Sequence, residues 1–195
     1  PDGQRPASLS HQALVRPDPG YPMVEPAARQ AFVRNADGTG TAADLGPADS
    51  LAWSPDGTRL ALTQLRVTGK DVTGVHRTVA VADTAATPLA LPADHVLTDW
   101  SPDGKHLLTQ AFTPPKAGGK EAEMRLSLRL PTGAVHKVLN GPTDLLLNGR
   151  VSPDGRRVLA EQFVPASRPG GLDYVRRLAV LDVATGAVAP LADYP

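Results

Sequence analysis

The sequence predicts an all-β chain made of four tandem repeats, each folding as four short antiparallel strands. Three observations lead to this prediction. One turn-forming tetrapeptide recurs at nearly constant spacing, short Val- and Leu-rich runs alternate with polar residues, and Pro and Gly separate those runs. Pro (20 residues) and Gly (18 residues) are unfavourable inside helices, so their frequency in a chain of 195 residues favours short strands joined by turns.

The tetrapeptide Ser-Pro-Asp-Gly marks the repeat. It occurs at 54–57, 101–104 and 152–155, and Pro1-Asp2-Gly3 resembles a fourth copy that lacks its serine. The four prolines are 54, 47 and 51 residues apart. Pro presets φ at the second position of a type I turn, Asp suits the third, and Gly takes the left-handed conformation that closes a hairpin. We therefore expect one strand before and one strand after each copy.

Apolar runs supply the strands of each repeat. The runs before the turns are 51–53, 97–100 and 145–147, and those after them are 59–62, 106–108 and 157–160. A further run about 30 residues beyond each turn (31–40, 79–83, 126–133 and 178–186) ends in a polar or glycine-containing turn and continues into another short apolar run. The repeat is therefore a four-stranded unit.

Tandem four-stranded units of this length are typical of β-propeller blades. One such sheet cannot bury both of its faces alone, so neighbouring blades must stack around an axis. Trp53 and Trp100 each directly precede a turn, and we assign them to packing between blades. The predicted organisation is a single partial propeller, 1–195, with repeats at approximately 1–46, 47–94, 95–143 and 144–195.

Two segments resemble the signature segments of TolB-like (PD40, WD40-like) propeller repeats, a bacterial family. Segment 53–61 reads Trp-Ser-Pro-Asp-Gly-Thr-Arg-Leu-Ala, and segment 32–39 reads Phe-Val-Arg-Asn-Ala-Asp-Gly-Thr. The resemblance implies antiparallel blades around a channel, usually about six to eight in a closed ring, and an extracytoplasmic location. With four repeats, the first lacking its innermost strand, we expect a partial ring that further blades or a second copy of the chain complete.

Composition excludes several classes of function. The 20 Lys and Arg residues balance the 20 Asp and Glu residues, so no chain-wide attraction to nucleic acid or to an anionic membrane is expected. No apolar run approaches the ~20 residues that cross a bilayer, so membrane insertion is not expected. The absence of cysteine rules out disulfides, thiolate metal sites and a cysteine nucleophile.

Motifs of catalysis and of cofactor binding do not occur, and we expect no enzyme activity and no cofactor within this chain. Neither Gly-x-Ser-x-Gly nor Gly-x-x-x-x-Gly-Lys is present, and the five histidines form no His-x-x-x-His pair. Segment 35–38, Asn-Ala-Asp-Gly, partly resembles a calcium loop, but Asp44 stands where a bidentate Glu is needed. We interpret this segment as a hairpin turn.

The connection between the second and third strands is predicted to be long in every repeat, at 10–30, 66–77, 113–123 and 165–176. Hairpins normally need two to five loop residues. Successive hairpins of a blade alternate between the two rims of a propeller, so these connections should project from one rim, where binding groups collect. The alternative is that they are solvated insertions without a function. The candidate binding residues are Arg66, Lys70, His76, Lys116, Lys120, Arg168 and Tyr174.

Two functions remain open. The first is a non-catalytic scaffold that binds a protein or peptide. The second, which the resemblance implies, is the regulatory or substrate-gating propeller of a larger, prolyl-oligopeptidase-like hydrolase. A downstream Gly-x-Ser-x-Gly within an α/β-hydrolase pattern would favour the hydrolase, and further Ser-Pro-Asp-Gly repeats alone would favour the scaffold.

Simultaneous replacement of Arg66, Lys70, Lys116 and Arg168 by Ala tests the predicted binding rim. We expect capture of a binding partner to be lost while the melting temperature stays unchanged, because loop cations contribute little to stability. Thermal denaturation and a binding assay on the same preparation check both parts. Unchanged capture would contradict the assignment of these cations to binding.

Overall fold

The computed structural model describes residues 7–10, 29–68, 71–113, 123–141, 144–168 and 171–193, and these residues form strands and turns without any helix. The strands are β1 (Ala7–Ser10), β2 (Gln30–Val33), β3 (Ala43–Pro47), β4 (Ser50–Trp53), β5 (Arg59–Thr68), β6 (Asp71–Ala80), β7 (Ala86–Pro88), β8 (His95–Trp100), β9 (Leu107–Thr113), β10 (Glu123–Arg129), β11 (Val135–Val138), β12 (Leu145–Val151), β13 (Arg157–Arg168), β14 (Gly171–Asp182) and β15 (Val188–Asp193). In the part of the chain described, no helix is long and apolar enough to cross a membrane.

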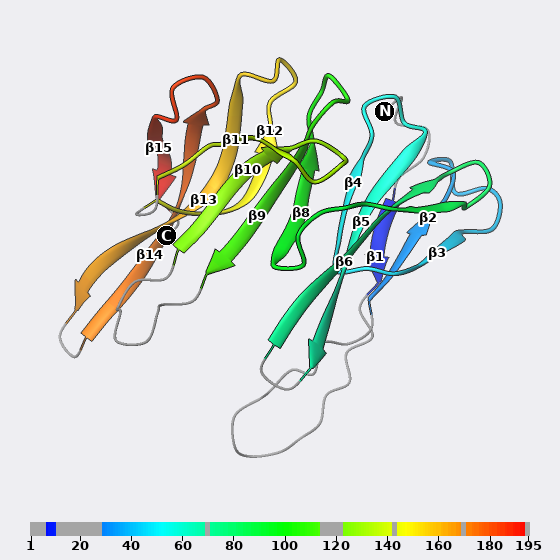
Figure 1. Cartoon of the computed structure of the whole chain (residues 1–195), viewed down its shortest axis with the longest axis horizontal. Coiled ribbons are helices and arrows are strands. Elements are labelled where there is room, and N and C mark those ends of the chain that lie inside the picture. Colours follow the sequence, from blue (N-terminus) through cyan, green and yellow to red (C-terminus); the bar gives the residue numbers. More distant parts are fainter. Residues whose placement is uncertain are drawn as a thin grey trace.

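The strands form four antiparallel sheets, which we call blades 1 to 4. Blade 1 has the order β1-β2-β3, and blades 2, 3 and 4 consist of β4 to β7, β8 to β11 and β12 to β15, each in sequential order. Figure 1 shows them side by side, and the described strands do not close a ring. The predicted all-β fold of partial propeller blades is confirmed, and among the described residues the first blade has three strands.

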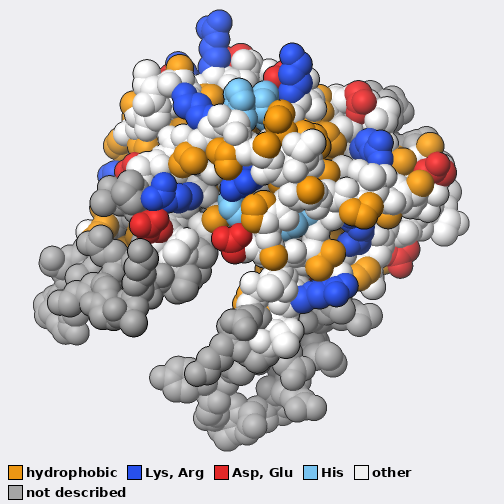
Figure 2. Space-filling model, viewed as in Figure 1, with side chains coloured by type: hydrophobic (Ala, Val, Ile, Leu, Met, Phe, Trp, Pro, Cys, Tyr) orange, Lys and Arg blue, Asp and Glu red, His pale blue; other side chains and the backbone are white. Residues whose placement is uncertain are grey.

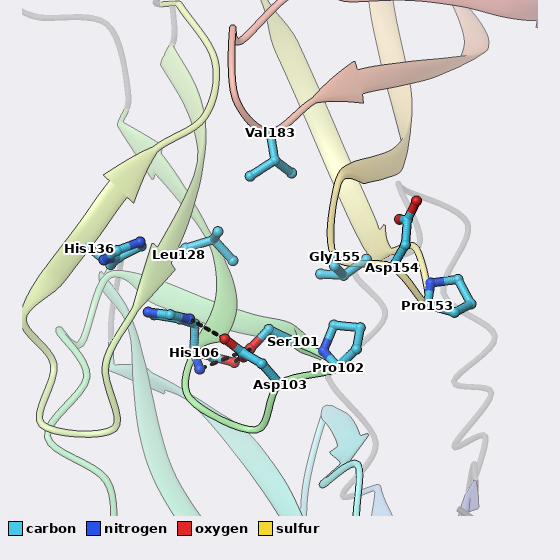
Figure 3. Close-up of a pocket in the computed structure, with 11 residues that line it drawn as sticks. Ser101, Pro102, Asp103, His106, Leu128, His136, Pro153, Asp154, Gly155 and Val183 are labelled. Atoms are coloured by element: carbon cyan, nitrogen blue, oxygen red, sulfur yellow. Dashed lines mark hydrogen bonds and ion pairs between the residues drawn. The ribbon is translucent and has the colours of Figure 1, made fainter.

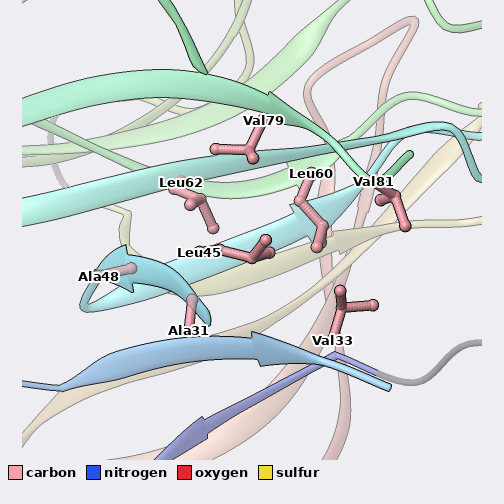
Figure 4. Packing of buried hydrophobic residues seen from close by; sticks show 8 residues of the cluster. All are labelled: Ala31, Val33, Leu45, Ala48, Leu60, Leu62, Val79 and Val81. Atoms are coloured by element: carbon pink, nitrogen blue, oxygen red, sulfur yellow. The ribbon is translucent and has the colours of Figure 1, made fainter. Parts of the chain in front are cut away.

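The core lies between the blades. Three clusters of buried side chains join blade 1 to blade 2, blade 2 to blade 3, and blade 3 to blade 4. In the first, Val33 and Leu45 of blade 1 pack against Leu60 and Leu62 of blade 2 (Figure 4). The apolar residue three positions after each turn glycine is fully buried: Leu60, Leu107 and Val158 are each 0% exposed. These residues anchor each second strand to a neighbouring blade.

The three Ser-Pro-Asp-Gly turns have the same geometry. In each, the glycine N–H donates to the serine carbonyl at 2.8–2.9 Å, and the glycine has a φ of 70° to 72°. The serine hydroxyl donates to the aspartate Oδ1 at 2.5–2.6 Å, and this oxygen also accepts the N–H two residues further on at 3.0 Å. Because the same bonds recur in three blades, we assign them to the structure of the turn.

The prediction of long loops is wrong for the second and fourth repeats. There the chain stays paired: Thr68 faces Asp71 across β5 and β6, and Arg168 faces Gly171 across β13 and β14. His76, which the sequence predicts to lie in a loop, lies within β6 and is buried. The corresponding segments of the first and third repeats, 11–28 and 114–122, lie outside the described residues.

Acid should weaken the turn at Asp56. The hydroxyl of Ser54 and the N–H and hydroxyl of Thr58 lower the pKa of Asp56 to about 2. A carboxylate whose pKa is lower in the folded state stabilises the fold above its unfolded pKa of about 4, and this stabilisation is lost as the pH falls toward 2. We expect Asp56→Asn to lose less melting temperature than the wild type between pH 5 and pH 2. Ser54→Ala, which removes the largest cause, should move the loss to higher pH; equal profiles for all three proteins would refute this account.

Candidate functional site

Two long hairpins project from one side of the molecule. Beyond Thr63, β5 has no partner on β4, and beyond Phe163, β13 has no partner on β12. We call the two-stranded extension 64–68 with 71–75 arm 1, and the extension 164–168 with 171–175 arm 2. Figure 1 shows both arms pointing the same way, on either side of blade 3. The two arms therefore flank the third blade.

The arms turn apolar side chains toward blade 3. Opposite residues of an antiparallel pair share a face, and every second residue along a strand returns to it. On arm 1, Leu65, Val67 and Val72 therefore lie on the face of Ala61, which packs in the cluster between blades 2 and 3. On arm 2, Val164 and Val175 share the face of Ala160, which packs against blade 3.

Three of these apolar residues are exposed, and Leu65 and Val164 are half-buried. Val67 is 53% exposed, Val72 is 54% exposed and Val175 is 37% exposed. Figure 2 shows hydrophobic side chains interspersed with Lys and Arg on the described surface of this face. We call the space over blade 3 that the apolar faces of arm 1 and arm 2 border the arm cleft.

A pocket of about 280 Å³ lies at the base of arm 1. Leu65 and Val72 of arm 1, Ala111 of β9 and Leu147 of β12 supply apolar walls, so blades 2, 3 and 4 all contribute. Its polar groups include Asp94, which is exposed, and Gln110. A pocket of this size and lining fits one large apolar side chain, with a carboxylate beside it.

Gln110 is held in place by a strained turn in the neighbouring blade. Asn148 has a φ of 54° at the bulge in β12, and its backbone N–H donates to the Gln110 side chain at 2.8 Å. Gly149, next in the chain, is buried, and a Cβ there would lie 2.8 Å from Leu108. β-Bulges commonly re-aim side chains beside functional sites.

The candidate residues from the sequence are only partly brought together. Arg66 is exposed on arm 1, on the face opposite to Leu65. Tyr174 is 46% exposed on arm 2. Arg168 lies in β13 near the tip of arm 2, and Lys70, Lys116 and Lys120 lie outside the described residues. The binding role of these residues stays a prediction, whereas His76 is buried below the cleft.

Sequence reasoning did not find Leu65, Val72, Asp94 and Gln110. A signal for the two on arm 1 was present, because Leu65 and Val67 alternate with the polar residues Arg66 and Thr68, and Val72 lies between the polar residues Asp71 and Thr73. For Asp94 and Gln110 no local pattern exists, since their position depends on how blades 2, 3 and 4 meet.

A second pocket, of about 460 Å³, lies between the Ser-Pro-Asp-Gly turns of blades 3 and 4 (Figure 3). The rings of His106 and His136 lie 4.1 Å apart, and His106 Nδ1 is 3.5 Å from Asp103. The Ser101 hydroxyl is bonded to Asp103, and this bond is the main cause that lowers the pKa of Asp103. The same serine–aspartate bond occurs in the turns of blades 2 and 4, so we assign it to the structure of the turn.

Metal coordination finds no support in the described part of the chain, where no group of three or more His, Cys, Asp or Glu side chains is placed to hold an ion. The segment that partly resembles a calcium loop is a hairpin turn: Gly38 N–H donates to Asn35, and Asp37 accepts from Thr39. The interpretation of 35–38 as a turn is therefore confirmed.

Solved structures with the same fold include TolB proteins and a peptidase. The chain is 18% identical to a putative TolB from Agrobacterium tumefaciens (TM-score 0.64; 99% of this chain, 62% of that one). It is 19% identical to TolB from Acinetobacter baumannii (TM-score 0.59; 85% and 38%). It is 14% identical to the acylaminoacyl peptidase of Pyrococcus horikoshii (TM-score 0.62; 97% and 31%).

These likenesses confirm the predicted TolB-like β-propeller architecture. No protein-family model and no curated protein sequence matches the chain. The chain spans less than two thirds of each of these three structures. The similarity therefore defines the class of fold, a β-propeller domain, and what the domain binds has to be argued from its own surface.

Gly74 should be intolerant of any side chain. A Cβ at this position would lie 2.6 Å from the His76 ring and 2.8 Å from the His95 carbonyl, beneath the pocket. We expect Gly74→Ala to lower the free energy of unfolding by about 1–3 kcal/mol through overpacking. In the control Gly141→Ala, the nearest atom is a side-chain oxygen of Asp144 at 3.3 Å, and the cost should stay below about 1 kcal/mol. Equal costs in chemical denaturation would contradict the close approach at Gly74.

Proposed function

We propose that this chain is a non-catalytic propeller scaffold that binds a protein or peptide in the arm cleft. The observation that supports it most is the pair of arms whose apolar faces are directed over blade 3. Val67 and Val72 face each other across arm 1, and each is more than half exposed. Exposed apolar surface gathered in one concave place favours a partner that covers it.

The chemistry of the cleft favours a polypeptide ligand. The pocket at its base accepts one large apolar side chain, and the exposed Asp94 beside it would pair with a basic neighbour on the ligand. The arms supply further apolar contacts over the length of a short segment. A peptide with a large apolar residue next to Lys or Arg matches these features.

A propeller domain of a larger hydrolase is the second candidate. The similarity to the acylaminoacyl peptidase supports it, because the matching region covers 97% of this chain but only 31% of that enzyme. The coding sequence on either side discriminates between the two. A downstream α/β-hydrolase pattern with Gly-x-Ser-x-Gly favours the hydrolase, and only further Ser-Pro-Asp-Gly repeats favour the scaffold.

The pair of substitutions Val67→Thr and Val72→Thr tests the scaffold. Thr has the shape and strand propensity of Val, so the arm should form, but each hydroxyl loses apolar contact with a ligand. For peptides selected against the wild type from a random displayed library, we expect the double variant to bind at least about tenfold more weakly in titration calorimetry.

Val135→Thr is the matched control. Val135 is 52% exposed on the outer strand β11, away from the arms, and its replacement should leave peptide affinity unchanged. Peptides that bind the double variant as tightly as the wild type, or a library that yields no binder, would refute binding in the arm cleft.

A further inference from the structure

Two buried histidines lie where blade 2 meets blade 3. His76 of β6 is 5% exposed and His95 of β8 is 6% exposed. Nδ1 of His76 is 3.0 Å from the Thr63 hydroxyl, and Nδ1 of His95 is 3.0 Å from the Thr109 hydroxyl. His95 also lines the pocket at the base of the arm cleft. The pair therefore links the candidate site to the joint between the two blades.

The Pro92 carbonyl places a proton on Nε2 of His76, so in the neutral ring Nδ1 is the acceptor. Nε2 is 3.1 Å from the Pro92 carbonyl, which can only accept. Nδ1 then accepts from the Thr63 hydroxyl, whose oxygen accepts the Leu97 N–H at 3.1 Å. This chain of bonds runs from blade 2 into β8 of blade 3. With a second ring proton, Nδ1 would donate to the Thr63 hydroxyl, and the hydroxyl proton would lose Nδ1 as its acceptor.

His95 is bound in the opposite tautomer. The Arg129 guanidinium lies 3.1 Å from Nε2 and can only donate, so Nε2 accepts. Nδ1 then carries the proton and donates to Thr109, whose hydroxyl is directed at the Ser127 carbonyl at 3.4 Å. Protonation of His95 would set an N–H against the N–H groups of Arg129, with two positive charges in contact. Arg129 is also fixed by a bond to the Gly133 carbonyl at 2.7 Å.

The surrounding charges also disfavour protonation. Burial lowers the pKa of both histidines, and the charges of Arg129 of β10 and His76 of β6 lower the pKa of His95 further. Asp94 acts in the opposite direction on the pKa of His95, and the Pro92 carbonyl does so on that of His76. Strands β5 and β9 face the two rings with the neutral hydroxyls of Thr63 and Thr109.

At the other two joints, cations donate to backbone carbonyls, and Asp99 of blade 3 accepts the Val151 N–H of blade 4 at 2.8 Å. Arg77 of blade 2 donates to the carbonyls of Leu45 and Pro47 in blade 1. Lys137 of blade 3 donates to the carbonyls of Val183 and Ala184 in blade 4. Arginine and lysine keep their charge between pH 5 and pH 8, whereas histidine changes its charge in this range.

We propose that His76 and His95 make the joint between blades 2 and 3 labile to mild acid. A histidine whose pKa is lowered in the folded joint contributes full stability above its unfolded pKa of about 6.5, and this stability falls as the pH drops below that value. The window lies above the range in which the turn aspartates act. Release of a ligand from the arm cleft at mildly acidic pH would rest on the proposed function. The acid lability of the joint itself does not depend on that function.

Amide hydrogen exchange of the free protein tests the joint without any ligand. The N–H of Leu97 in blade 3 donates to the Thr63 hydroxyl of blade 2, and the N–H of Gly74 in blade 2 donates at 2.5 Å to Ala93, in the connection between these blades. After correction for intrinsic exchange, we expect their opening constants to rise at least about tenfold between pH 7.5 and pH 5. The N–H of Ala48, which donates to Arg29, is the internal control and should not respond.

Variants and a direct titration complete the experiment. In His76→Gln/His95→Gln the exchange of Leu97 should not depend on pH, and His136→Gln, on the outer strand β11, should behave as the wild type. If the double variant does not fold, the NMR titration of the wild-type rings decides. Folded-state titration of both rings at or above pH 6.5, or pH-independent exchange of Leu97, would overturn the proposal.

Discussion

The structure depends on one constraint: each blade is a sheet with two faces, and only a neighbouring blade can cover them. The three clusters of buried side chains are accordingly shared between blades, and none belongs to a single sheet. Leu60 and Ala61, adjacent in β5, serve opposite neighbours, one in the cluster with blade 1 and the other in the cluster with blade 3. The stability of any blade is therefore tied to the blades beside it.

Polar contacts between blades follow the same constraint, because buried strand ends leave carbonyls that need donors. Lysine and arginine supply the donors at two joints, from Lys137 and from Arg77. At the middle joint, the His76 ring donates to the Pro92 carbonyl, and the Thr63 hydroxyl accepts the Leu97 N–H. This difference places two histidines under the arm cleft.

Much of the fold could be predicted from the sequence because it is encoded locally. Ser-Pro-Asp-Gly determines a turn through the φ of Pro and Gly and the bonds of Ser and Asp, and alternation in β10 determines a strand. The interpretation of Arg66, Lys70 and Asp71 as loop residues overlooks arm 1, although Arg66 alternates with Leu65 and Val67. The burial of His76 could not be predicted, since its partner Pro92 belongs to the connection between blades 2 and 3.

The arms and the histidine joint are physically one unit. An isolated two-stranded hairpin is marginally stable in water, so arm 1 needs support from the body of the protein. Two hydrogen bonds give arm 1 this support: Leu65 N–H donates to Asp49 at 2.7 Å, and Gly74 N–H donates to Ala93. Ala93 is next to Asp94 and His95, so a ligand that orders arm 1 and a proton that opens the joint act on the same bonds. Such coupling is reciprocal: if acid weakens a ligand in the cleft, that ligand must make His76 and His95 harder to protonate.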